Sequence, residues 1–538
     1  MVVNMISNIR SLKNRNKFLL IILFNTLFFS LAAYLLPIRF EENDDVFMCV
    51  IASGAYSGAP DAHLVFINYI YGLVLTFFYN TFQGIEWYTL FFCIIHVVSL
   101  SIIVFKFIKI NKPVLVKSVF ILLLYVIELR IILLFQFTTT AGIGAFAGAL
   151  LLFGTKKIYK FFGVFLFLIA VLVRFDAAML SMLLMLPVFG YEIFSDKRKV
   201  AKILIPIVIC ICGAFGLRAI DNHIYNTNKE WSEYKKYIAT IGYLVNNFNT
   251  WRTKNNLPDG ISKNDYLLLR CVFTDGKVIN LPKLKELADL VHKIPLTVKL
   301  KNIYPSLRKY TSVLGLIVVL FVFCFWSEKQ NKGKICCIFY LAFFLGILSY
   351  ISIDGILKYR VFITALFPVI FSLYTNVSSF SDKKLKIGYV GVVLILSLFL
   401  LNHSYQIREL RNTYEKTVVA EQSAVMKEVQ NKNVSVVPLS IDLTWELFYS
   451  PFDVSKTFDS YSMIITTWFT NIIPFNKGRF DSYMSLVDTN LYLFISDENI
   501  EKYAVAIQKS LIDNYDCDTE IIKKIGNGQY WLIQFKKK

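Results

Sequence analysis

Four carboxylates stand within five residues in the segment 41–45 (EENDD), directly after an apolar run that ends at residue 38. Charged groups close to hydrocarbon are costly and usually have a function where they occur. Asp44 and Asp45 are expected at the depth of the lipid head groups, where partial shielding from water raises a carboxylate pKa and suits it to act as a general base on a hydroxyl group. The pair could equally bind a divalent cation, Mg²⁺ or Mn²⁺, through oxygen ligands, or belong to a solvated acidic loop. Asp44 and Asp45 are therefore candidate catalytic residues, and candidate metal ligands only if the reaction depends on a metal.

A second set of charged residues could bind an anionic substrate at the same level. Arg174 and Asp176 interrupt two apolar runs at a predicted outer turn, and Lys358 and Arg360 do the same later in the chain. Cations at the head-group boundary can bind a lipid phosphate by charge-assisted hydrogen bonds, which Arg can make in pairs. The alternative is that they extend towards water from an apolar surface or form local Arg–Asp pairs.

Asp61 and His63 end a stretch of small residues, 53–63, that contains two glycines and a proline. Such residues allow tight turns and a close approach of the backbone to a ligand. Asp61 and His63 are thus candidates to line a substrate site, although a single His is more often structural.

These residues must be positioned by membrane helices. Of the 538 residues, 56% are hydrophobic and 16% are aromatic, which is more apolar surface than a soluble domain can bury. Eleven apolar runs have spanning length: 18–38, 87–105, 118–137, 138–155, 158–173, 177–194, 200–217, 310–326, 335–353, 361–377 and 387–403. The sequence predicts an α-helical polytopic membrane protein with about eleven transmembrane helices.

The charge distribution predicts the orientation of these helices. The formal net charge is +19 at pH 7, and the short loops on one side of the predicted membrane hold 21 lysines and arginines. The segments 39–86, 137–141, 174–176 and 354–360 on the other side together hold four. Cytoplasmic loops carry such an excess, so the amino terminus is predicted inside and the carboxyl terminus outside, and no nucleic-acid partner is needed to explain the charge.

Three longer segments fall on the predicted outer side: 39–86, 218–309 and 404–538. Residues 63–82 are apolar enough to span, but a span there would reverse every later loop against the charge rule, so we interpret them as an amphipathic or re-entrant helix along the outer face. Strand patterns at 434–439, 491–496, 519–525 and 530–535, with a helical pattern at 498–514, are typical of a small α/β domain. The predicted division is a transmembrane domain over 1–403 and an extracytoplasmic α/β domain over 404–538.

Two ionisable residues lie inside the third apolar run. Glu128 and Arg130 are two positions apart and cannot face each other on one helix. Each is expected to pair with another residue of the bundle, and the alternative is that they line a transport path. The nine cysteines form no CxxC pair or His/Cys cluster, so neither a zinc site nor a structural disulfide is expected.

In this arrangement the chain resembles the GT-C superfamily of integral-membrane glycosyltransferases. Members have a cytoplasmic amino terminus, a first outer loop with an acidic motif just after the first helix, helices along the membrane surface, and in many cases a soluble outer domain at the end. Asp44 and Asp45 match the catalytic position, whereas Arg174, Lys358 and Arg360 match only in kind. No WWD-like motif of oligosaccharyl transferases occurs, which argues against protein N-glycosylation. The resemblance implies a polyprenyl-phosphate sugar donor, inversion at the anomeric carbon, and a cell-envelope glycan, lipid or polymer as acceptor.

The sequence therefore predicts an inverting glycosyltransferase at the outer face of a plasma membrane, and the richness in Lys, Asn, Ile and Phe suggests a bacterial one. A transporter or flippase of a lipid-linked sugar is the main alternative. No internal repeat or matched pair of broken helices in the sequence supports it. A non-catalytic scaffold that presents residues 404–538 outside is a third possibility.

Overall fold

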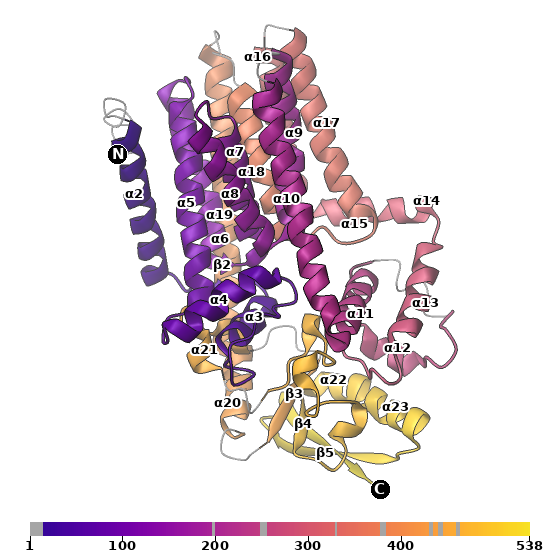
Figure 1. The fold of residues 1–538 in the computed structure, drawn as a ribbon. Coiled ribbons are helices and arrows are strands. Elements are labelled where there is room, and N and C mark those ends of the chain that lie inside the picture. Colours follow the sequence, from indigo (N-terminus) through magenta and orange to yellow (C-terminus); the bar gives the residue numbers. More distant parts are fainter. Residues whose placement is uncertain are drawn as a thin grey trace.

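The computed structural model describes residues 14–195, 200–247, 256–328, 331–376, 383–429, 434–439, 445–458 and 463–538. Long helices that run side by side form the main body of the molecule (Figure 1). They are α2 (Asn14–Leu35), α5 (Trp87–Lys109), α6 (Val114–Leu133), α7 (Phe137–Leu152), α8 (Lys157–Val173), α9 (Phe175–Ser195), α10 (Val200–Thr227), α16 (Thr311–Ser327), α17 (Asn331–Ile353), α18 (Tyr359–Asn376) and α19 (Lys383–Tyr414). Each predicted apolar run falls on one of these helices.

Within the described ranges, six helices are long and apolar enough to cross a membrane. They cover Asn14–Leu35, Trp87–Lys109, Phe175–Phe194, Val200–Thr227, Gly333–Ile353 and Lys386–Lys427. A seventh candidate is a pair of helical segments, Leu296–Arg308 and Thr311–Ser327, that meet at an angle of 86°. The chain is a multi-pass membrane protein. The count of eleven spans stays a prediction, because helices such as α7, with 16 residues, are short for a bilayer. The orientation of the helices stays a prediction as well.

Helix α7 lies at the centre of the bundle, and nearly all of its residues are buried. It is rich in Ala and Gly, so its neighbours can approach closely. A Cβ atom on Gly148 would lie 2.7 Å from the carbonyl oxygen of Gly163 in α8. The two glycines therefore allow backbone contact between α7 and α8, the helix that Arg174 follows.

The acidic segment is attached to the bundle by a short parallel strand pair, β1 (Arg39–Phe40) and β2 (Leu134–Phe135). The Glu41 amide continues the pairing by donating to the Phe135 carbonyl at 2.9 Å. Helix α3 (Asn43–Ser53) begins directly afterwards, and its residues from Asp44 to Ala52 are buried. Because β2 immediately precedes α7, this pairing places the start of α3 against the start of α7.

The predicted surface helix at 63–82 forms α4 (Tyr69–Thr81), so it begins later than expected. The Asn68 side chain caps it by accepting a hydrogen bond from the Ile70 amide at 3.0 Å. Thirteen residues of helix extend about 20 Å, which is shorter than the roughly 30 Å hydrocarbon core. Helix α4 lies across one end of the bundle, beside α3 (Figure 1). Its position relative to a membrane remains a prediction.

The segment predicted as a polar outer loop, 218–309, is largely helical. Helix α10 continues through its first residues, and α11 (Lys229–Asn246), α12 (Lys263–Leu269), α13 (Leu281–His292), α14 (Leu296–Lys299), η3 (Leu300–Asn302) and α15 (Ile303–Arg308) follow. A capping box at Ser262 and Asp265 begins α12, and Asn280 caps α13. Helices α11, α12 and α13 lie towards the same end of the bundle as α3 and α4 (Figure 1).

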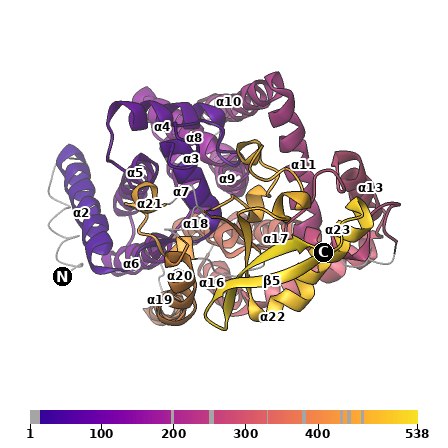
Figure 2. The ribbon, with the colours of Figure 1, turned by 90° about the horizontal axis from the view of Figure 1, so that it is seen from below.

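The C-terminal region contains a four-stranded sheet in the order β3-β4-β6-β5. Strands β3 (Ser435–Pro438) and β4 (Leu491–Ser496) are parallel, and β6 (Tyr530–Lys537) pairs antiparallel with both β4 and β5 (Thr519–Gly526). The helical pattern at 498–514 appears as α22 (Asp497–Asn499), η9 (Ile500–Ala504) and α23 (Val505–Tyr515). Seen along the bundle, the sheet and α23 overlie part of the helix ends (Figure 2).

Short elements join this sheet to the bundle. Helix α19 runs past the predicted boundary at 403 and is followed by a π-helical turn, η4 (Glu415–Val419), and α20 (Ala420–Lys427). The remaining elements are η5 (Trp445–Phe448), α21 (Val454–Thr457), η6 (Thr467–Phe469), η7 (Pro474–Asn476) and η8 (Tyr483–Leu486). The last helix of the bundle therefore continues without a linker towards the C-terminal region.

The two ionisable residues inside α6 have separate partners, as predicted. Glu128 lies 2.6 Å from Nδ1 of His96 in α5, and Nε2 of the same ring lies 2.9 Å from the Thr140 hydroxyl in α7. Arg130 lies 3.6 Å from Glu41. The first contact connects three helices in the bundle interior, and the second connects α6 to the acidic segment.

Loss of Glu128 should therefore destabilise the bundle. We expect Glu128→Ala to lower the free energy of unfolding by about 1–3 kcal/mol, the usual cost of leaving a buried hydrogen-bonding group without its partner. The measurement is thermal unfolding in detergent. The double variant His96→Phe/Glu128→Leu should recover part of the loss, because apolar groups can replace a buried pair. A Glu128→Ala protein as stable as the wild type would contradict a structural role.

Candidate active site

Asp44 is the residue in the acidic segment best suited to act as a base. It lies in the first turn of α3, and only 4% of it is exposed. Its Oδ1 atom is buried and has no hydrogen-bond partner among the described residues. Burial raises the pKa of Asp44 to about 7, helped by the charge of Glu42 and opposed by Arg360, Arg174 and Lys358. A carboxylate with a near-neutral pKa and a free oxygen can accept a proton from a hydroxyl group.

Asp45 has a different environment, although it is the next residue. It is fully buried, and its Oδ1 accepts hydrogen bonds from the Tyr88 hydroxyl at 2.9 Å and from the Phe137 amide at 3.1 Å. Phe137 is the first residue of α7, so Asp45 satisfies a free amide at the start of that helix. The Oδ2 atom of Asp45, like Oδ1 of Asp44, is buried without a described partner. The two carboxylates therefore differ in the two hydrogen bonds by which Asp45 positions α3 against α5 and α7.

The three cations predicted as phosphate ligands come together around Asp44. Arg360 follows the first residue of α18 and forms an ion pair with Glu42. Lys358 lies just before α18, with its Nζ atom 5.7 Å from the ring centre of Trp468. Arg174 and Lys358 both act electrostatically on Asp44 and on Arg360. Cations from the start of α18, from the residue before it and from the α8–α9 turn thus lie within electrostatic range of one carboxylate of α3.

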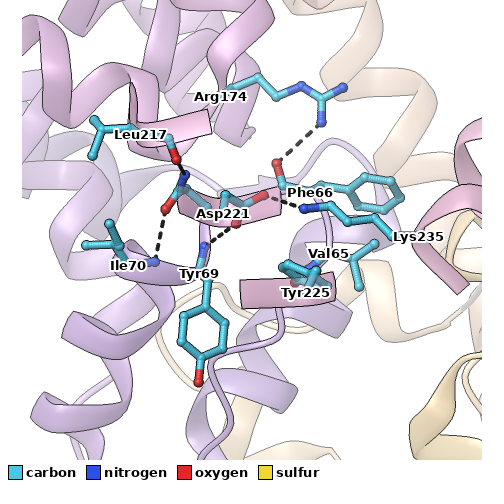
Figure 3. Close-up of polar contacts among 10 residues, drawn as sticks. Val65, Phe66, Tyr69, Ile70, Arg174, Leu217, Asp221, Tyr225 and Lys235 are labelled. Carbon is cyan, nitrogen blue, oxygen red and sulfur yellow. Dashed lines mark hydrogen bonds and ion pairs between the residues drawn. The ribbon is translucent and has the colours of Figure 1, made fainter. Parts of the chain in front are cut away.

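Arg174 is oriented by several neighbours. Its Nη1 atom donates to the Phe66 carbonyl at 3.4 Å (Figure 3). Its guanidinium lies 5.3 Å from the ring centre of Phe137. Asp176 contacts it at 3.7 Å, but the Asp176 side chain is 69% exposed. Asp176 therefore supports Arg174 from the solvent side and does not lie in the cluster itself.

Residues 65–69, which include the Phe66 carbonyl that accepts from Arg174, are bound in turn to α10, and α10 pairs with α11. Asp221 of α10 accepts a hydrogen bond from the Tyr69 amide at 2.8 Å and pairs with Lys235 of α11 (Figure 3). The Tyr225 hydroxyl contacts the amide of Val65, at 3.0 Å, and Val65 has a φ of 67°. A β-branched residue in this region is strained, and such strain concentrates at functional sites.

Asp61 and His63 form a separate cluster. The His63 ring nitrogen Nδ1 lies 2.7 Å from Asp61 Oδ1, and the ring stacks on Trp231 with centroids 4.4 Å apart. Tyr69 and Tyr225 contact the same ring edge to face. No contact between these two residues and Asp44 is seen among the described residues, so their role as substrate ligands stays a prediction.

Two neighbours of the site were not singled out in the sequence. Glu42 belongs to the acidic segment, but its ion pair with Arg360 depends on the packing of α18 against α3. Trp468 lies in η6 of the C-terminal region, flanked by Thr467 and Thr470, whose φ angles are 60° and 57°. Phe469 packs on Phe66, which fixes η6 beside the site. No local pattern in the sequence connects residue 468 to residue 358.

The described residues contain no group of three or more His, Cys, Asp or Glu side chains that could hold a metal ion. Asp44 and Asp45 are adjacent, but one Asp45 oxygen is occupied by the two donors described above. Three cations already lie close enough to Asp44 to affect its pKa. These residues suit an anion better than Mg²⁺, which prefers several oxygen ligands in octahedral geometry.

No protein-family model matches the sequence, and no curated protein matches it. The structure is similar to the crystal structure of ArnT from Cupriavidus metallidurans in the apo state. The similarity covers 97% of this chain and 98% of that chain, with 10% sequence identity and a TM-score of 0.41. Similarity of this extent does not assign an activity. The chemistry must therefore be inferred from the residues of the site.

Proposed function

We propose that this protein is an inverting glycosyltransferase of the GT-C type, which moves a sugar from a polyprenyl-phosphate donor to a cell-envelope glycan, lipid or polymer. The observation that carries the proposal is the meeting of a buried, unpartnered carboxylate, Asp44, with three cations from two other parts of the chain. A base and an anion site side by side are what attack by a hydroxyl group and departure of a phosphate require.

The reaction follows from this arrangement. Asp44 takes the proton of the acceptor hydroxyl as the oxygen forms a bond to the anomeric carbon of the sugar. The bond from that carbon to the phosphate oxygen breaks, and its electron pair leaves on the polyprenyl phosphate. Arg174, Lys358 and Arg360 stabilise the charge that develops on the leaving oxygen. Attack from the side opposite the phosphate inverts the anomeric centre.

The test of this function uses purified protein in detergent with radiolabelled polyprenyl-phosphate sugars and an extract of cell-envelope lipids and glycans. We expect the donor to be consumed and the label to appear in an acceptor. A flippase would leave the donor intact, and that result would overturn the proposal. Because the three cations supply positive charge at the site, we propose that no metal is needed and expect EDTA to leave the activity unchanged. Loss with EDTA that Mg²⁺ or Mn²⁺ restores would overturn this part.

The flippase alternative gains no support from Glu128 and Arg130. Glu128 contacts His96, and Arg130 contacts Glu41, so each has a local partner. The carboxylates and cations of the site also gather at one end of the bundle, near α3, which suits chemistry on one side of the membrane (Figure 1).

We further propose that this end of the bundle faces the extracytoplasmic side. Two cysteine substitutions at exposed positions test it: Ser57→Cys in the loop after α3, and Asn111→Cys in the loop between α5 and α6. In intact cells, an impermeant maleimide is expected to label the first and not the second, measured against the wild-type background from the native cysteines. The reverse pattern would overturn the orientation.

The pH dependence of transfer should follow Asp44. Burial raises its pKa from 3.8 to about 7, and the base works only when deprotonated. We expect kcat/KM to fall about tenfold per pH unit below this pKa and to level off above it. The measurement is a pH–rate profile with subsaturating donor. A profile that stays flat from pH 5 to 8 would contradict Asp44 as the base.

A further inference from the structure

A second cluster of arginines lies on the other side of the β1 strand from Asp44. A pocket there is lined by residues from the link between α2 and β1, from β1, the end of α6, β2, α19, η4 and η5: Pro37, Arg39, Leu133, Leu134, Ile407, Arg408, Arg411, Asn412, Glu415 and Phe448. Three of these side chains are arginines, and one is a glutamate. The pocket therefore has an excess of positive charge next to an apolar wall.

The arginines have unused hydrogen-bonding capacity. Arg408 makes no hydrogen bond or ion pair with any described residue, and its Nε atom is buried. The Nε atom of Arg39 is also buried without a described partner, although its guanidinium contacts Glu415 at 3.2 Å. Buried donors without a partner are costly, and a guanidinium satisfies them best with a phosphate or carboxylate. The donors of Arg39 and Arg408 thus suit an anionic group.

Arg411 connects this pocket to the acidic segment. Its Nη1 and Nη2 atoms donate to the carbonyls of Phe40 and Glu41, each at 3.0 Å. Glu41 contacts Arg130, whereas Glu42 contacts Arg360. None of the residues that line the pocket is among the proposed site residues Asp44, Arg174, Lys358 and Arg360, so the two sites are made by different side chains.

The surroundings of the pocket indicate an amphiphilic ligand. Helix α19, which contributes to it, and the last turns of α2, which precede Pro37 in the chain, carry exposed large apolar side chains. Leu31, Leu35, Tyr405 and Leu410 are between 51% and 61% exposed. Such surfaces on membrane helices face lipid tails, so a ligand with its anionic group on the arginines would have its chains along these helices.

We propose that the pocket of Arg39, Arg408 and Arg411 binds the phosphate group of a lipid, independently of the glycosyl-transfer site. The phosphate accepts hydrogen bonds from Arg408 and Arg39, and the acyl or prenyl chain lies on α2 and α19. Because Arg411 holds the backbone before Asp44, an occupied pocket stabilises the position of the acidic segment. The same chemistry fits an anionic phospholipid or a polyprenyl phosphate.

Native mass spectrometry of the purified protein in neutral detergent tests this proposal. The probes are phosphatidylglycerol, polyprenyl phosphate, diacylglycerol and inorganic phosphate. We expect Arg408→Gln to weaken the binding of at least one lipid phosphate by about tenfold, equivalent to one charged contact. Diacylglycerol and inorganic phosphate, which lack the anionic group or the chains, are expected to bind weakly. The lipid that responds distinguishes the two sources of phosphate.

Three controls make the result decisive. Arg308→Gln removes an exposed arginine on α15 that does not line the pocket, and should bind the lipids as the wild type does. Asp44→Asn should also bind normally, which separates this proposal from the proposed activity. Arg408→Lys should retain part of the binding, which excludes a folding defect. Equal binding by Arg408→Gln and wild type, or diacylglycerol binding as tight as phosphatidylglycerol, would overturn the proposal.

Discussion

Replacement of Asp44 by Asn is expected to lower kcat for sugar transfer by at least about 100-fold, the usual scale for loss of a general base. Asn has nearly the same volume and lacks the proton-accepting charge. Asp44 makes no hydrogen bond through its buried Oδ1 atom, so the variant breaks no described contact there. The measurement is initial-rate transfer from the labelled donor, normalised to folded protein.

Asp45→Asn is the matched control one residue away. The Asp45 carboxylate accepts from Tyr88 and Phe137, so its replacement should lower the free energy of unfolding by about 1–3 kcal/mol through loss of a charged acceptor. Its effect on kcat per folded molecule should be much smaller than that of Asp44→Asn. The assignment of the base to Asp44 fails if Asp44→Asn transfers sugar at the wild-type rate, or if Asp45→Asn alone loses the activity.

Replacement of Arg360 by Gln is expected to lower kcat by about 100- to 1,000-fold, the range seen when one preorganised donor to a developing negative charge is removed. Arg360 acts electrostatically on Asp44 and pairs with Glu42 at the start of α18. Its loss should also move the pH–rate profile to higher pH, because Arg360 lowers the pKa of Asp44. Steady-state kinetics over pH 5–9 measure both effects. Arg360→Lys should recover only part of the rate, since an ammonium cannot bind a phosphate in the bidentate way.

The Arg360→Gln variant needs a control, because the substitution leaves Glu42 without its ion-pair partner. Without Arg360, the charge of Glu42 stands uncompensated beside Asp44. The double variant Glu42→Gln/Arg360→Gln removes that charge as well. If the double variant regains wild-type kcat, Arg360 serves only to neutralise Glu42, and its role in stabilising the leaving phosphate is wrong. A double variant that stays slow supports direct action on the donor.

The apolar runs of the sequence located the long helices because burial in lipid or among other helices needs long, unbroken apolar stretches. The strands of the C-terminal region were predictable for a related reason. Residues 491–496 combine β-branched and aromatic side chains in a short run, and they form β4, which pairs with strands on both sides. The helices within 218–309 were not predicted. Their polar composition hid the helical periodicity, and they pack on one another and on the C-terminal region.

The sequence by itself determined which residues have the right chemistry: the carboxylates after the first helix and the cations at 174, 358 and 360. Composition and charge are local properties, so they can be read along the chain. Only the tertiary structure decided that Asp45 accepts hydrogen bonds from Tyr88 and Phe137, whereas no described residue donates to the Asp44 side chain. It also stacked His63 on Trp231 and brought Trp468 to Lys358. These outcomes depend on contacts between residues far apart in sequence, which no spacing along one chain encodes.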